Sequence, residues 1–323
     1  MTDVKCDAIM STKLRMPYDE VKEIMKNQIE QLKREKNAVI LAHYYAPAQV
    51  QEIADYVGDS FYLAKIAKQT DADIIVFCGV QFMGESAKIL NPHKKVLMPD
   101  LTADCPMAHM VADGIIEKLR RQYEDLAVVC YINSTAALKC KSDVCVTSSN
   151  AVKIVKALPN QNIFFIPDRN LGSFVAQQVP EKNIILNDGC CPIHAKITAA
   201  QVLEEKKKHP GAPVLTHPEC EAAIVQISDF IGSTADIIAY ARNNDSKEFI
   251  VCTEDGVDFK LVTDNPDKRF YYPNPHPCCV DMKRNTLESV LAVLQKEDKE
   301  VFVDDAVRKN ALIPLERMLE LAK

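Results

Sequence analysis

The amino-acid sequence repeats one unit three times at intervals of 86 to 88 residues, which restricts the possible folds more than any other feature. Apolar runs that end in polar residues open the copies: AVILAHYY (38–45), AVVCYINS (127–134) and APVLTHPE (212–219). A second motif keeps the same spacing: DYVGDS (55–60), DVCVTS (143–148) and DFIGST (229–234). Ordinary alternation of strands and helices does not fix polar residues at matching offsets, so we interpret the chain as a triplication.

Each copy alternates short apolar runs with amphipathic stretches. The Val- and Ile-rich runs are typical of buried parallel strands, and the segments at 60–69, 149–158 and 234–243 have helical spacing. We therefore predict an α/β fold of three pseudo-symmetric, three-layer α/β/α domains with parallel sheets around a central site. The predicted parts are an N-terminal helical extension (1–36), three repeats (37–125, 126–210 and 211–303) and a C-terminal helix (304–323).

Composition narrows the class of protein. The net charge of −6 argues against a nucleic-acid-binding surface, which needs a basic patch. No apolar stretch is long enough to span a membrane, and the N-terminal residues lack the apolar core of a signal peptide. The chain has 9 glycines and neither of the usual glycine-rich phosphate-binding motifs. We expect a cytoplasmic protein without nucleic-acid or membrane partners.

Recurring polar residues follow the first strand of each copy. His43, Tyr131 and His217 correspond at separations of 88 and 86, as do the residues two positions later: Tyr45, Asn133 and Glu219. Residues i and i+2 of a strand share a face, and ligands bind beyond the carboxyl ends of parallel strands. The repeat therefore predicts that these pairs converge on one central site.

Hydroxyl residues begin the next predicted helix of each copy: Ser60, Ser148 and Thr234. N-capping is the simplest role for such residues and is expected to be part of theirs. Helix N-termini also bind anions, so three that converge indicate a small ligand with several negative charges.

One cysteine in each copy completes the pattern. Cys105, Cys191 and Cys279 are separated by 86 and 88 residues. Three converging thiolates suit a 4Fe–4S cluster with one iron open to substrate, whereas the paired motifs of zinc sites are missing. The neighbouring Cys190 and Cys278 could replace two of these ligands, and the spacing leaves that choice open.

Long motifs resemble the quinolinate synthase family of NAD biosynthesis. They cover most of the chain and include AHYYAPAQVQEIAD, FMGESAKILNP, MPDLTADC, GCCPIH and CVDMKRNTLESV. The resemblance implies three α/β domains around a 4Fe–4S cluster held by one cysteine from each. It also implies that iminoaspartate and dihydroxyacetone phosphate condense to quinolinate, phosphate and two waters. The family loops favour Cys105, Cys191 and Cys279 as the ligands. An aspartate oxidase or aspartate dehydrogenase is then expected to supply iminoaspartate.

The resemblance also implies a set of active-site residues, most of which the repeat had already selected. The expected substrate-binding residues are His43, Ser60, Tyr131, Asn133, Ser148, His194, His217, Glu219, Ser233 and Thr234. Glu219 beside His217 is our candidate for the general base, because the reaction removes several protons. His43 and Tyr45 are expected to polarise or protonate oxygens of the triose.

Two other classes of function compete with this interpretation. A cluster-containing redox or iron sensor needs no ring of polar side chains, and it predicts no turnover of small molecules. A zinc hydrolase usually carries HExxH or paired CxxC motifs, neither of which occurs here. Metal analysis separates the second alternative from an iron–sulfur protein.

Overall fold

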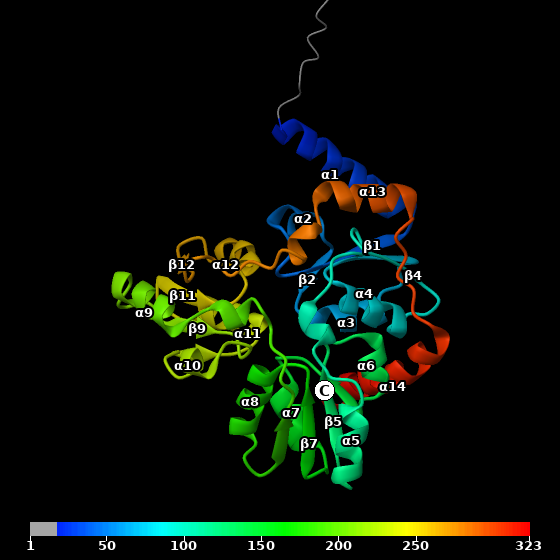
Figure 1. Ribbon diagram of the computed structural model, residues 1–323. Coiled ribbons are helices and arrows are strands. Elements are labelled where there is room, and N and C mark those ends of the chain that lie inside the picture. Colours follow the sequence, from blue (N-terminus) through cyan, green and yellow to red (C-terminus); the bar gives the residue numbers. More distant parts are fainter. Residues whose placement is uncertain (1–17) are drawn as a thin grey trace, which may run out of the picture.

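The three repeats form three parallel sheets of four strands each (Figure 1). A computed structural model describes residues 18–323, so Cys6 and the rest of residues 1–17 of the predicted N-terminal extension lie outside the described residues. The strand orders are β2-β1-β3-β4, β6-β5-β7-β8 and β10-β9-β11-β12. The strands are β1 (Ala38–His43), β2 (Tyr56–Gly58), β3 (Ile74–Cys78), β4 (Lys95–Leu97), β5 (Ala127–Tyr131), β6 (Val144–Val146), β7 (Asn162–Ile166), β8 (Asn183–Leu186), β9 (Val214–Thr216), β10 (Phe230–Ile231), β11 (Glu248–Cys252) and β12 (Arg269–Tyr271). One order in all three sheets confirms the predicted α/β fold.

Helices flank the sheets, as three-layer domains require. They are α1 (Tyr18–Glu35), α2 (Ala48–Ile53), α3 (Ser60–Gln69), α4 (Gln81–Leu90), α5 (Ile115–Gln122), α6 (Ala136–Cys140), α7 (Ala151–Ala157), α8 (Arg169–Gln178), α9 (Ala199–Lys208), α10 (Ala222–Val225), α11 (Thr234–Asn243), α12 (Asp258–Asp264), α13 (Leu287–Lys296) and α14 (Asp305–Leu321). Short 3₁₀ turns are η1 (Pro106–His109), η2 (His194–Lys196), η3 (Asp255–Val257) and η4 (Met282–Arg284). Between residues 18 and 323, none of the helices has the length and apolar character needed to cross a bilayer.

An aspartate holds the first two strands of each repeat together. The Asp55 carboxylate accepts the Ile40 N–H at 2.8 Å, and the bonds from Val128 to Asp143 and from Val214 to Asp229 repeat this at 2.7 and 2.9 Å. In each repeat the aspartate N–H also donates to the carbonyl of the same strand residue. These aspartates lie at the amino ends of the strands, away from the converging ends, so their repetition reflects sheet assembly.

The helix that follows each sheet packs against the next sheet. On α5, Arg120 pairs with Asp143 beside the second sheet. On α9, Val202 joins the core of the third sheet, and α13 returns to the first sheet, where Val290 and Leu294 share a core with its strands. Figure 1 shows α13 and α1 side by side over the first sheet. The first unit is thereby linked to the second, the second to the third, and the third back to the first. The domain boundaries given above stay a prediction.

The end of α13 is tied to the first unit by an ion-pair network. Glu297 pairs with Lys36, just after α1, and lies 2.6 Å from Lys95 Nζ at the start of β4. Hydrogen bonds from these two lysines lower the pKa of Glu297 to about 2. Because the folded pKa lies below the ordinary value of about 4.3, this carboxylate stabilises the fold at neutral pH.

We expect Glu297→Gln to lower the free energy of unfolding by about 1 kcal/mol at pH 7, since the pairs are partly exposed. The difference from wild type should persist down to about pH 4.3 and disappear as the pH falls toward 2, because the native carboxylate then gains its proton. Urea unfolding of both proteins across this pH range measures the difference in their free energies of unfolding. A difference that stays constant down to pH 2 would contradict the assignment.

Candidate functional site

A cavity of about 240 Å³ lies where the three units meet. All three repeats line it with residues that sequence analysis had selected: His43, Tyr45, Ser60, Cys105, Tyr131, Asn133, Ser148, Cys191, His194, His217, Glu219, Thr234 and Cys279. Ser233 is the exception, because it is fully buried one residue outside the lining and bonds to Asp236. The structure thus brings together residues separated by more than 200 positions in the chain.

Parallel strands deliver the three first-position residues to this cavity. His43 ends β1, Tyr131 ends β5 and His217 directly follows β9. Each is at most 5% exposed. The carboxyl ends of all three central strands face the same space, so the matched repeat positions become neighbours in three dimensions.

Burial keeps His43 neutral. Loss of water, helped by nearby His217, lowers the pKa of His43 to about 3. Its Nδ1 atom accepts the Tyr45 N–H at 3.1 Å, which leaves the ring proton on Nε2. Burial also lowers the pKa of His217. At neutral pH both rings are therefore neutral, and His43 offers an N–H donor on Nε2.

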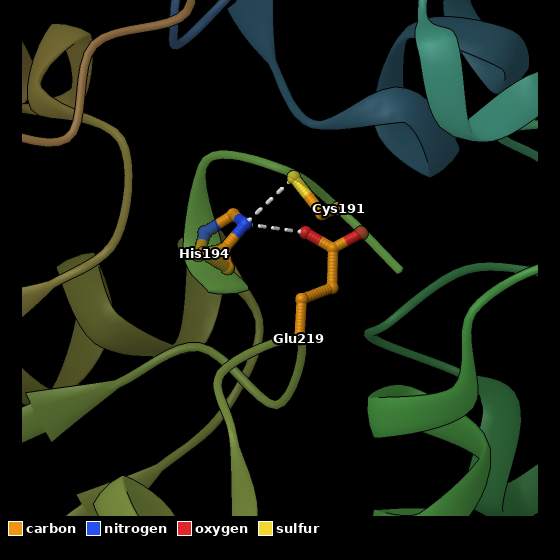
Figure 2. Close-up of side chains that lie close together, drawn as sticks. All are labelled: Cys191, His194 and Glu219. Carbon is orange, nitrogen blue, oxygen red and sulfur yellow. Dashed lines mark hydrogen bonds and ion pairs between the residues drawn. The ribbon is translucent and has the colours of Figure 1, made fainter. Parts of the chain in front are cut away.

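The Glu219 carboxylate contacts two histidines, and Figure 2 shows its contact with His194. Its Oε2 atom lies 2.9 Å from His194 Nδ1 and 3.3 Å from His217 Nδ1. Burial alone would raise the pKa of Glu219, but the two histidines outweigh it and hold the pKa below its usual range. The other oxygen, Oε1, is buried without a hydrogen-bond partner. A buried acceptor left unpaired is costly, so this atom is available to a ligand.

A chain of hydrogen bonds runs from Glu219 to the first unit through Thr253. The ionised Glu219 can only accept, so His194 Nδ1 donates to it, and His194 Nε2 shares a hydrogen bond of 2.9 Å with the Thr253 hydroxyl. Thr253 in turn lies 2.8 Å from the Tyr45 hydroxyl, which also contacts Thr234 at 2.8 Å. Burial raises the pKa of Tyr45, so its phenol stays protonated.

Thr253, which is fully buried next to His194, is a site residue that the sequence patterns did not predict. It directly follows β11, within the repeated run at 248–255, so its position was visible in the repeat. The repeat did not show that Thr253 matters to the site, because its role depends on contacts with Tyr45 and His194 from other units.

The three cysteines occupy equivalent loops. Cys105 directly precedes η1, whereas Cys191 and Cys279 lie three residues before η2 and η4. Burial raises the pKa of Cys105 to about 12 and that of Cys279 to about 11, and it also raises the pKa of Cys191. Backbone N–H groups of the following turns oppose this effect at each sulfur. These loops therefore offer N–H donors where a metal-bound thiolate needs them.

The cavity distinguishes the adjacent cysteines. Cys191 and Cys279 line it together with Cys105, whereas Cys190 and Cys278 do not. Among the described residues, the three lining sulfurs do not form a group whose atoms all lie within 4.8 Å of one another. Cys191, His194 and Glu219 do form such a group, which could hold a single ion. Sequence analysis had given these three residues separate roles.

The predicted helix-opening residues require a correction. The cap of α3 is Asp59, whose side chain accepts the Tyr62 N–H, so Ser60 is the first helical residue and caps nothing. Ser148 lies in the turn before α7, whose cap position is Asn150. For α11 the cap is Ser233 rather than Thr234. The predicted capping role was wrong because better acceptors directly precede Ser60 and Thr234 and because α7 begins after Asn150; all three predicted residues line the cavity instead.

The chain is similar to known proteins over most of its length. The quinolinate synthetase A protein family matches residues 27–320. A quinolinate synthase of Caldicellulosiruptor saccharolyticus is 52% identical, covering 93% of this chain and 99% of the relative. Those of Clostridioides difficile and Aquifex aeolicus are 49% and 47% identical. They cover 92% and 94% of this chain, and 97% and 96% of the relatives.

The corrected caps predict unequal effects of two neighbouring substitutions on stability. Asp59→Ala should lower the free energy of unfolding by about 1 kcal/mol, because the Tyr62 N–H loses its acceptor. Ser60→Ala should change it by less than about 0.5 kcal/mol. Thermal unfolding of the ligand-free variants measures both. A larger loss for Ser60→Ala than for Asp59→Ala would restore the original prediction.

Proposed function

The chain belongs to the quinolinate synthetase A protein family, and we propose that it condenses iminoaspartate with dihydroxyacetone phosphate to form quinolinate. The condensation releases phosphate and two waters and makes the protein a transferase with a dehydrating step. The single observation that carries the proposal is the shared cavity. It combines three thiols, one from each repeat, with two buried acceptors that have no partner, Glu219 Oε1 and Asn133 Oδ1.

The cavity suits small anions that carry several oxygens. His43 offers a neutral N–H donor, and the buried phenols of Tyr45 and Tyr131 stay protonated. Ser60 and Ser148 also line it, and neither is the cap residue of the helix that follows, so their hydroxyls are free of that role. Hydroxyl and N–H donors in a buried site bind carboxylate and phosphate oxygens strongly. We assign these groups to substrate binding, together with Asn133, His194, Thr234 and the adjoining Ser233.

The three thiols fit a 4Fe–4S cluster. Cys105, Cys191 and Cys279 come from three separate loops, line one cavity and have backbone N–H donors at each sulfur. A single ion needs ligands closer together than these sulfurs are, whereas a cluster holds its ligands farther apart. When bound, a cluster with one iron lacking a protein ligand supplies a Lewis acid that polarises a substrate oxygen.

Glu219 is suited to accept substrate protons. Formation of the ring joins the two substrates through a C–C and a C–N bond and removes protons from carbon and nitrogen. Glu219 stays ionised, presents Oε1 to the cavity and contacts His194 and His217 through Oε2. A proton taken by Oε1 can therefore pass toward a neutral histidine. His43 and Tyr45 donate to oxygens of the triose as they leave as water.

Iminoaspartate is a reactive imine, so its supply matters. Iminoaspartate forms when aspartate is oxidised, by an aspartate oxidase or an aspartate dehydrogenase. Because the imine is reactive, this oxidation must take place close to the enzyme that uses it. We propose that the protein works in the cytoplasm alongside such an enzyme.

We expect about four irons and four sulfides per chain in anaerobically purified protein. Combining Cys105→Ala, Cys191→Ala and Cys279→Ala should abolish both, while Cys190→Ala with Cys278→Ala, the matched control, should retain them. The loaded protein should form quinolinate from the two substrates without oxygen. One zinc and no sulfide would indicate the group Cys191, His194 and Glu219 instead. An intact cluster without product would favour a sensor.

Glu219→Gln should lower kcat by about 10²- to 10⁴-fold, because the proton acceptor is lost, while iron and sulfide content stay at wild-type levels. Glu221→Gln is the matched control, since Glu221 follows closely but lies outside the cavity lining and pairs with Arg169. Anaerobic quinolinate assays and metal analysis measure both variants. Wild-type turnover by Glu219→Gln would remove Glu219 from the proton-transfer role.

A further inference from the structure

One backbone hydrogen bond fixes each cysteine loop to the end of the third strand of its own repeat. The donors and acceptors are Gln81 N to Ala103 O at 2.8 Å, Arg169 N to Gly189 O at 2.7 Å, and Asp255 N to Pro277 O at 2.9 Å. Each acceptor lies two residues before a cavity-lining cysteine. The loops are therefore docked in the same way in all three repeats.

Two of the loops have a second anchor, a buried carboxylate. Asp168 follows β7 and accepts the Cys191 N–H at 3.1 Å through Oδ2. Glu254 follows β11 and accepts the Cys279 N–H at 2.9 Å through Oε1. Their side chains are 0% and 1% exposed. Both lie two residues after the third strand, and they are 86 residues apart, so they are the same position of the repeat.

The second oxygen of each carboxylate is also engaged. Asp168 Oδ1 accepts the Leu171 N–H at 2.7 Å at the start of α8. Glu254 Oε2 accepts the Gly256 N–H at 2.8 Å, and its Oε1 also pairs with Lys283. Each carboxylate thus connects the cysteine main chain to the turn that follows the strand. Neither side chain can rotate without breaking two hydrogen bonds to backbone N–H groups.

The space around the second loop is equally restricted. A Cβ atom at Gly189 would lie 2.6 Å from the Pro167 carbonyl, so only glycine permits this approach of loop to strand. The position of the Cys191 N–H relative to Asp168 is therefore set by backbone packing as well as by the hydrogen bond.

The first repeat holds its cysteine loop by a different contact. The equivalent of Asp168 and Glu254 is Val80, 88 residues before Asp168, which offers no acceptor. The Cys105 N–H instead donates to the adjacent Asp104 at 2.7 Å, a partly exposed residue that also pairs with His109. Buried carboxylates thus hold the Cys191 and Cys279 loops, whereas a partly exposed carboxylate holds the Cys105 loop.

We propose that Asp168 and Glu254 are positioning residues that hold the Cys191 and Cys279 loops in the conformation that binds the cluster. This inference rests on the proposed function, because it concerns the ligands of the proposed cluster. Asp168 lies outside the cavity lining and Glu254 lies within it, and each acts on the cluster through the main chain of its cysteine. An amide in either place keeps the shape but has one acceptor oxygen, so one of two N–H donors faces an NH₂ group.

The test uses Asp168→Asn and Glu254→Gln in anaerobically prepared, cluster-loaded protein. Asn is itself a strong helix cap, so Asp168→Asn should keep α8 intact and leave the Cys191 N–H unpaired. We expect each variant to lose iron to a bipyridyl chelator about 10- to 100-fold faster than wild type, the usual scale for outer ligand-supporting groups. The thiolate-to-iron charge-transfer absorption of the remaining cluster should also change.

Asp143→Asn is the matched control. Asp143 lies in the same unit as Asp168 and accepts a buried strand N–H in the same way, but it sits at the amino ends of the strands. Its substitution should lower the melting temperature of the ligand-free protein and leave both the iron-loss rate and the absorption spectrum unchanged. A merely structural role for Asp168 and Glu254 predicts the same behaviour for all three variants.

Two results overturn the inference, and they differ in what else they overturn. Wild-type protein with no iron or sulfide would remove the proposed cluster and this inference together. The second result is a wild-type protein with a full cluster and two variants, Asp168→Asn and Glu254→Gln, that match its iron-loss rate and its spectrum. That result would overturn the positioning role alone. Glu254→Gln decides the question independently, because Glu254 caps only the short η3 turn.

Discussion

Three parallel sheets direct the carboxyl ends of their strands at one cavity, and this convergence depends on how the helices are exchanged between units. Helices α5, α9 and α13 each leave one sheet and cover the next, so apolar burial that stabilises one unit also fixes the position of its neighbour. Polar residues that are distant in sequence are thereby held within hydrogen-bond distance. The closing contact is that of α13 on the first sheet, where C-terminal residues complete an N-terminal core.

Burial at the point of convergence determines the protonation of the side chains. His43 and His217 are kept neutral and Tyr45 is kept protonated, because charge is costly in a space with little water. Glu219 is the contrasting case, since two imidazoles stabilise its ionised form. Glu219 is therefore an ionised carboxylate beside neutral N–H and O–H donors, an arrangement suited to move a proton while binding anionic groups.

The triplication supplies one scaffold, and the repeats have diverged at its functional positions. The first-strand position holds His43, Tyr131 or His217, with the same backbone location each time. The position after the third strand holds valine in one repeat and a carboxylate in the other two. By contrast, the aspartate that joins the first two strands is the same in all three repeats, because every sheet needs that bond. Positions that assemble the sheet stayed alike, whereas those that face the cavity became specialised.

Much of this architecture could be predicted from the sequence. The period and the apolar runs indicated three parallel sheets, and the helices at 60–69 and 234–243 begin and end where amphipathic spacing placed them. Local pattern was insufficient for the helix caps, because Asp59 and Ser233 compete with the residues that follow them and only backbone geometry decides between neighbours.

The sequence by itself determined the repeated unit and the set of residues at strand ends, because periodicity depends only on positions along the chain. The tertiary structure alone decided which oxygen of Glu219 lacks a partner and how Thr253 joins Tyr45 to His194. Those features are contacts between units, and their geometry is set by the packing of helices across unit boundaries.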